Sequence, residues 1–109
     1  MFATARQSAP LVTTEINTGE EASSRLLRYI VAKANYMPEP HRKSYLAGSQ
    51  SWAFNLAEIE SALGMQAEEV DDALCFLHTN DYLKVETYSY GYRFRVWLRM
   101  PVIETVRYP

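Results

Sequence analysis

Arginine and aromatic side chains alternate near the C-terminus of this chain. Successive side chains of an extended strand point to opposite faces, so one face of Tyr92–Arg99 would carry Arg93, Arg95, Trp97 and Arg99. Arginine binds phosphate with a planar fork and stacks on flat rings, and such a face can hold single-stranded nucleic acid. The same pattern also fits the polar outer face of an ordinary β-hairpin or a surface for a protein partner, so all three interpretations stay open.

Two further groups of residues have side chains suited to binding a partner. The basic cluster His41-Arg42-Lys43 follows Pro38 and Pro40, and in a loop its Arg42 and Lys43 would be able to touch phosphate or simply be solvated. The run Tyr88-Ser89-Tyr90-Gly91-Tyr92 is rich in tyrosine, which is enriched at protein interfaces. Because DNA-facing hairpin tips more often carry Arg or Lys, Tyr88 and Tyr90 fit a protein surface at least as well as a DNA groove.

The stretch Asn55–Leu83 has the opposite charge. It holds seven acidic residues and no Lys or Arg, whereas the rest of the chain holds 11 basic and six acidic residues. Three interpretations remain: a solvated helix face, a docking surface for a basic protein partner, or a helix that enters a DNA groove, which its charge disfavours. The candidate partner-binding residues here are Glu68, Glu69, Asp72 and Phe76, a residue at the border of the inner helix face.

Catalytic chemistry is not expected. The chain has no phosphate loop or nucleophile elbow, and His41 and His78 lack the neighbours of a metal site. Nearby carboxylates would disfavour the thiolate of Cys75, the single cysteine. We therefore predict no enzyme, no catalytic residues, no metal and no cofactor.

Local signals predict the elements that position these groups. A capping box at Thr18–Glu21 would start a helix whose apolar face runs from Leu26 to Met37 and which stops by Pro38. Residues 38–51 would form a loop, or a loop with one short helical turn, and residues 52–54 a brief extended segment.

The next elements follow from capping and alternation. Asn55 would cap a helix Leu56–Leu63 with Leu56, Ile59, Ala62 and Leu63 in the core, and Gly64 would end it in the left-handed conformation. A second helix would start at Gln66 or Ala67, bury Val70, Ala73, Leu74 and Leu77, and close at Asn80-Asp81. Strands Leu83–Tyr88 and Tyr92–Leu98 would form a hairpin. Their inward residues would be Leu83, Val85, Thr87, Tyr92, Phe94, Val96 and Leu98, leaving Lys84, Glu86 and Tyr88 outside.

This layout resembles the winged helix-turn-helix superfamily over roughly residues 20–98. The residues that carry the resemblance are Leu56-Ala57-Glu58-Ile59, Leu63-Gly64-Met65, Val70, Leu74, Leu77 and Tyr82-Leu83. It implies a small α+β fold of three helices and a two-stranded hairpin, with DNA binding as the usual function. We expect the domain at residues 18–100, with tails at 1–17 and 101–109. Residues 11–14 or 102–108 would be able to add a strand to the hairpin edge.

Length and composition set the remaining expectations. A chain of 109 residues, 48% hydrophobic and 22% charged, is typical of one soluble globular domain. One cysteine and the lack of a leader or long apolar run favour the cytoplasm. Two hypotheses follow. The first is a DNA-binding regulator that uses the arginine face and the basic cluster at residues 41–43, with a homodimer adding positive surface. The second is a protein-interaction module that uses the acidic helix, Phe76 and the tyrosines.

Overall fold

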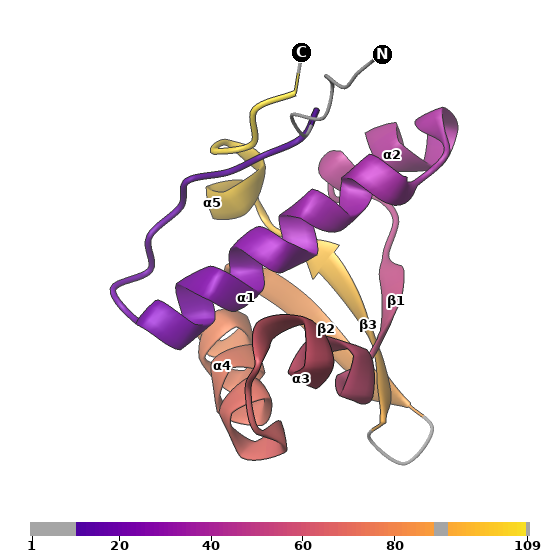
Figure 1. The fold of residues 1–109 in the computed structure, drawn as a ribbon. Helices are drawn as coiled ribbons and strands as arrows, with labels where there is room; N and C mark the ends of the chain where they lie inside the picture. The colour runs from indigo at the N-terminus through magenta and orange to yellow at the C-terminus, as the bar shows by residue number, and fades with distance from the viewer. Residues whose placement is uncertain (1–10, 89–91, 109) are drawn as a thin grey trace, which may run out of the picture.

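Three antiparallel strands and five α-helices form the fold of residues 11–88 and 92–108, the part of the chain that this computed structural model describes (Figure 1). The α+β class expected from the sequence is confirmed, but three helices and a two-stranded hairpin were too few elements. In chain order the elements are α1 (Glu21–Ala32), the 3-10 helix η2 (Lys33–Tyr36), α2 (Glu39–Leu46), β1 (Trp52–Asn55), α3 (Leu56–Leu63), α4 (Ala67–Thr79), β2 (Leu83–Tyr88), β3 (Arg93–Leu98) and α5 (Met100–Ile103).

Helix α1 lies across one face of the sheet and packs against α4 (Figure 1). Its apolar residues Leu26, Leu27, Ile30 and Val31 are fully buried, as their helical spacing predicts. The predicted capping box is wrong, because Glu20 occupies the N-cap position without a side-chain hydrogen bond. The N–H of Thr18 instead donates to the hydroxyl oxygen of Ser24 over 2.8 Å, which ties the residues before the helix to its first turn.

Helix α2 occupies the segment expected to be a loop with at most one short helical turn. Pro40 lies in the first turn, where its missing N–H would have no partner in any case. Tyr45 is fully buried and its hydroxyl donates to the carbonyl oxygen of Ile30 over 2.7 Å. Burial raises the pKa of the Tyr45 hydroxyl far above its ordinary value, because the phenolate would lose its hydration. Packing on α1 therefore stabilises a helix that local signals do not favour.

The turn after α2 depends on Gly48. Its φ is +80°, in the left-handed region, and a Cβ there would lie 2.7 Å from the carbonyl oxygen of Leu98 and 2.8 Å from Ile103 Cδ1. Glycine is thus required both by the backbone conformation and by the close approach of β3.

The α3–α4 unit forms as its capping signals predict. The Asn55 side chain accepts from the N–H of Ala57 over 2.9 Å, and Gly64 ends α3 with φ +64°. A reciprocal capping box between Gln66 and Glu69 starts α4. Ile59, Val70, Ala73, Leu74 and Leu77 are buried, but Ala62 is exposed and Leu56 and Leu63 are only half-buried. The sequence therefore predicts too many buried residues in α3, because this short helix contacts its neighbours along a narrow stripe.

The sheet has the order β1-β3-β2, so the hairpin gains a third strand. β1 pairs with β3 from Trp52↔Val96 to Asn55↔Arg93, and the stacked rings of Phe54 and Phe94 lie 5.9 Å apart in the core. Phe94, Val96 and Leu98 face inward as predicted. Tyr92 and Thr87 are exposed, against expectation, because the outer end of the hairpin extends beyond the core.

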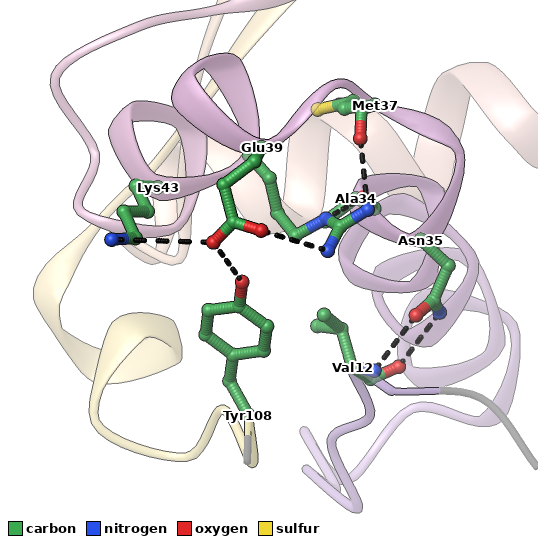
Figure 2. Close-up of polar contacts among 8 residues, drawn as sticks. Val12, Ala34, Asn35, Met37, Glu39, Lys43 and Tyr108 are labelled. Atoms are coloured by element: carbon green, nitrogen blue, oxygen red, sulfur yellow. Dashed lines mark hydrogen bonds and ion pairs between the residues drawn. The ribbon is translucent and has the colours of Figure 1, made fainter.

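Residues 11–17 and 101–108, the described parts of the two segments expected as tails, pack on the domain. Val12 and Val102 are fully buried, and the Asn35 side chain makes two hydrogen bonds with the backbone of Val12 (Figure 2). Thr13 and Arg107 form an antiparallel bridge. The two segments therefore pair with each other and not with the hairpin, whose neighbour is β1.

Candidate functional site

The outer face of the sheet gathers the predicted arginines. We call Lys84, Arg93, Arg95, Trp97 and Arg99 the basic sheet face. Its four cationic residues are exposed and Trp97 is half-buried, while the alternate residues of β3 are buried in the core. Strand alternation puts Arg93, Arg95 and Trp97 at intervals of about 6.8 Å along β3. The structure thus brings together four of the six predicted nucleic-acid-binding residues, and Lys84 joins them.

Intramolecular contacts on this face are few and exposed. Lys84 Nζ lies 4.8 Å from the centroid of the Trp97 ring and 3.5 Å from a carboxylate oxygen of Glu86. Arg95 donates from Nη1 to the Ser51 hydroxyl over 2.9 Å, and Arg99 Nη2 lies 3.3 Å from Asp81. Exposed pairs of this kind contribute about 0–1 kcal/mol. Phosphate oxygens are therefore able to replace these partners at little cost.

Arg42 has a structural role instead. Its guanidinium donates to the carbonyl oxygens of Ala34 over 3.0 Å and Met37 over 2.9 Å, which closes the end of η2 (Figure 2). Its side chain is only 14% exposed. Arg42 was a candidate for phosphate contact, and these hydrogen bonds hold two of its five N–H donors.

Lys43 lies apart from the basic sheet face. Its Nζ is 4.0 Å from Glu39, whose carboxylate also accepts from the Tyr108 hydroxyl over 3.1 Å (Figure 2). Helix α2 thus directs the Lys43 side chain toward the C-terminal segment. The structure does not join Arg42 and Lys43 to the arginines of β3.

Helix α4 presents a carboxylate-rich surface. Glu68, Glu69, Asp71 and Asp72 are exposed, and in the part of the chain that the structure describes no Lys or Arg lies within 4.0 Å of them. Phe76 is half-buried and stacks on Tyr82 at 6.4 Å between ring centroids, so it mainly extends the core. The side chain of Tyr88 and the whole of Tyr90 lie outside the described residues, so their predicted role rests on sequence alone.

A shallow groove of about 200 Å³ separates α4 from β2. The imidazole Nδ1 of His78 accepts from the N–H of Val85 over 3.1 Å at one side of it. Sequence reasoning missed this groove, although helical spacing on α4 and alternation on β2 do place its residues on facing sides. The lining residues are Asp71, Leu74, Cys75, His78, Thr79, Val85 and Thr87.

Metal and membrane sites are not evident in the described ranges. Within residues 11–88 and 92–108 no cluster of three His, Cys, Asp or Glu side chains is arranged to hold a metal ion. No helix in those ranges has the length and apolar character needed to cross a bilayer.

Comparison with protein families, curated proteins and solved structures finds no match for this chain. A function therefore has to be inferred from its own surfaces.

Proposed function

We propose that this protein is a small, non-enzymatic winged-helix protein that binds DNA through the basic sheet face. The order of elements supports the winged-helix assignment: α3, the Gly64 turn and α4 lead directly into the hairpin β2–β3, and β1 pairs beside it. Helix α1 covers the inner side of this sheet (Figure 1). The hairpin would be the wing.

The observation that carries this proposal is the separation of charge by the sheet. The arginines of β3 point away from the core, whereas α4 packs against β2 and α1 with its carboxylates exposed on its own outer side. A ligand on the basic sheet face therefore meets four cations, a tryptophan and the carboxylate of Glu86, and the sheet lies between it and the core helices. Arginine and aromatic groups together favour phosphates and bases.

Helix α4 is a poor candidate for the groove-reading element. DNA affinity comes largely from Lys and Arg that neutralise phosphates, and α4 has none. Its exposed Glu68 and Asp72 would repel the backbone on either side of a groove. We infer that the wing leads any contact with DNA and that α4 stays outside.

A salt-titrated binding assay tests the proposal. Fluorescein-labelled single-stranded and duplex DNA are titrated with the protein while fluorescence anisotropy is measured, starting at about 50 mM salt. We expect saturable binding that weakens with salt and favours the single strand, because an open sheet face has no groove-entering helix. The proposal fails if neither DNA is bound at the lowest salt.

A second candidate function is a protein-interaction module that binds a basic protein through α4. The specific observation in its favour is that, within the described ranges, the carboxylates of Glu68 and Asp72 have no basic partner. Glu68→Lys with Asp72→Lys should then abolish binding of a lysine-rich peptide. If this change strengthens DNA binding and leaves peptide binding unaltered, the second candidate is wrong.

A further inference from the structure

Among residues 11–88 and 92–108, strand β2 has one edge that no other strand pairs with. The sheet order is β1-β3-β2, so β2 has β3 on one side only. In antiparallel pairs, residues alternate between exchanging hydrogen bonds with the neighbouring strand and pointing their N–H and C=O away from it. An edge of this kind can accept an additional strand.

Two hydrogen bonds fix which residues point outward. The N–H of Arg99 donates to the carbonyl oxygen of Tyr82, so Tyr82 and every second residue after it bond to β3. The N–H of Val85 donates to His78 and therefore points away from β3. By alternation, Val85 and Thr87 direct their backbone groups to the open edge. The imidazole of His78 accepts the N–H of Val85, while the Val85 carbonyl and the N–H and C=O of Thr87 make no hydrogen bond to another described residue on this side.

The space beside this edge suits side chains of an added strand. The groove between α4 and β2 is lined largely by apolar atoms of Leu74, Cys75, Val85 and Thr87. Every second side chain of a strand laid along β2 would point toward the inner face and into this groove. The sheet edge thus offers hydrogen bonds, and the groove offers a place for apolar side chains.

The charges beside the open edge of β2 and the groove indicate the chemistry of a partner strand. Asp71 lines the groove, and Glu68 lies one helical turn before it on the same side of α4. On the outer face of β2, Glu86 lies next to the same edge and is exposed. Glu86 already has two cations beside it, because Lys84 Nζ contacts it and Arg95 is its partner across the β2–β3 pair. The carboxylates of Glu68 and Asp71 remain, and a strand with lysine or arginine beside apolar residues would complement them.

We propose that β2 accepts an extended, basic and apolar segment of a partner protein as a fourth strand, packed into the groove against α4. This inference names the partner class of the protein-interaction candidate and rests on it, and it is independent of DNA binding by the basic sheet face. A second copy of this chain fits less well, because pairing two β2 edges would bring two acidic α4 helices close together.

A peptide of alternating lysine and valine is the probe, and the unaltered protein is the target. Two further peptides carry N-methyl groups on all valines or on all lysines. The N–H groups of alternate residues in a strand point to opposite edges, so only one of the two methylated peptides loses the donors that face β2. Affinity is measured by isothermal titration calorimetry at low salt.

The two methylated peptides should differ in their affinity for the protein. One methylated peptide should bind at least about tenfold more weakly than the parent, which is the loss expected for about one backbone hydrogen bond or more, and the other should bind like the parent. Equal binding of all three peptides, or equal loss by both methylated peptides, would overturn strand addition while leaving charge-driven docking on α4 intact. Failure of the parent peptide to bind would overturn both.

A variant pair tests the same edge from the protein side. Thr87→Pro removes an N–H that points away from β3, so an edge strand should tolerate it, and Thr87→Ala is the matched control. We expect the proline variant to bind the parent peptide about tenfold more weakly than the alanine variant. Equal affinities would contradict the inference. Sedimentation of the free protein adds one outcome: a dimer that Thr87→Pro dissociates would assign the edge to a second copy, against our proposal.

Discussion

Replacing two arginines of the basic sheet face should change how steeply the proposed DNA binding depends on salt. The perturbation is Arg93→Ala with Arg95→Ala. Both side chains are exposed, and the buried residues of β3 alternate with them, so the fold should persist. Each phosphate neutralised on a single strand contributes about −0.7 to the slope of log affinity against log salt.

The magnitude follows from the number of cations on the basic sheet face. Four positive side chains, Lys84, Arg93, Arg95 and Arg99, would give a slope near −2.8, or about a 50-fold loss of affinity between about 50 and 200 mM salt. Two remaining cations would give a slope near −1.4, or about a sevenfold loss over the same range. The double variant should also bind more weakly at every salt concentration.

Fluorescence anisotropy with labelled single-stranded DNA measures both slopes. The matched control is Lys43→Ala with Arg107→Ala, which removes two exposed charges from outside the sheet. We expect the control to keep the slope of the unaltered protein. An unchanged slope in the arginine variant would refute the assignment of binding to the basic sheet face. An equal reduction in the control would refute it too, and would indicate only a general effect of net charge.

Three further predictions concern the scaffold and are measured by urea unfolding followed by circular dichroism. Gly48→Ala should lower the free energy of unfolding by about 2–4 kcal/mol, because it adds a backbone clash to left-handed strain. Gly64→Ala, with φ +64° but open space around it, should cost only about 1 kcal/mol, and equal costs would contradict the clash. Asn35→Ala should cost about 2–3 kcal/mol, since its amide makes two hydrogen bonds with Val12 and one with α1; a loss under about 0.5 kcal/mol would show that the N-terminal segment adds little stability. The folded protein holds the Tyr45 proton more tightly than the unfolded chain. The stabilisation that this difference gives the folded state is fully present below about pH 10 and is lost as the pH rises above it. Tyr45→Phe should therefore lose less stability than the unaltered protein between about pH 8 and pH 11, and equal losses would exclude Tyr45 as the cause.

The predictable parts of the fold are those whose signals act over a few residues. Asn55 caps α3 through its own side chain, Gly64 takes a conformation that other residues avoid, and alternation sorts β3 into buried and exposed residues. Each of these effects needs only neighbours in the chain. The helix–turn–helix and the hairpin were therefore placed correctly.

The parts that were missed depend on distant partners. Helix α2 is stabilised by burial of Tyr45 against α1. The extended segment expected at residues 52–54 is present, but its pairing with β3 as a third strand was not predicted. Val12 enters the core through Asn35, 23 positions away. Local propensity carries no information about such contacts, because tertiary packing outweighs it.

The same division holds for the candidate surfaces. Sequence alone determined that Arg93, Arg95 and Trp97 share one face and that α4 is acidic, since both follow from the period of a single element. Tertiary structure alone decided that the Arg42 guanidinium donates to the carbonyls of Ala34 and Met37, that β3 is the central strand, and that β2 has an open edge beside a groove in the described part of the chain. Those outcomes arise from hydrogen bonds and packing between elements far apart in the chain, and a single element's pattern cannot specify its neighbours.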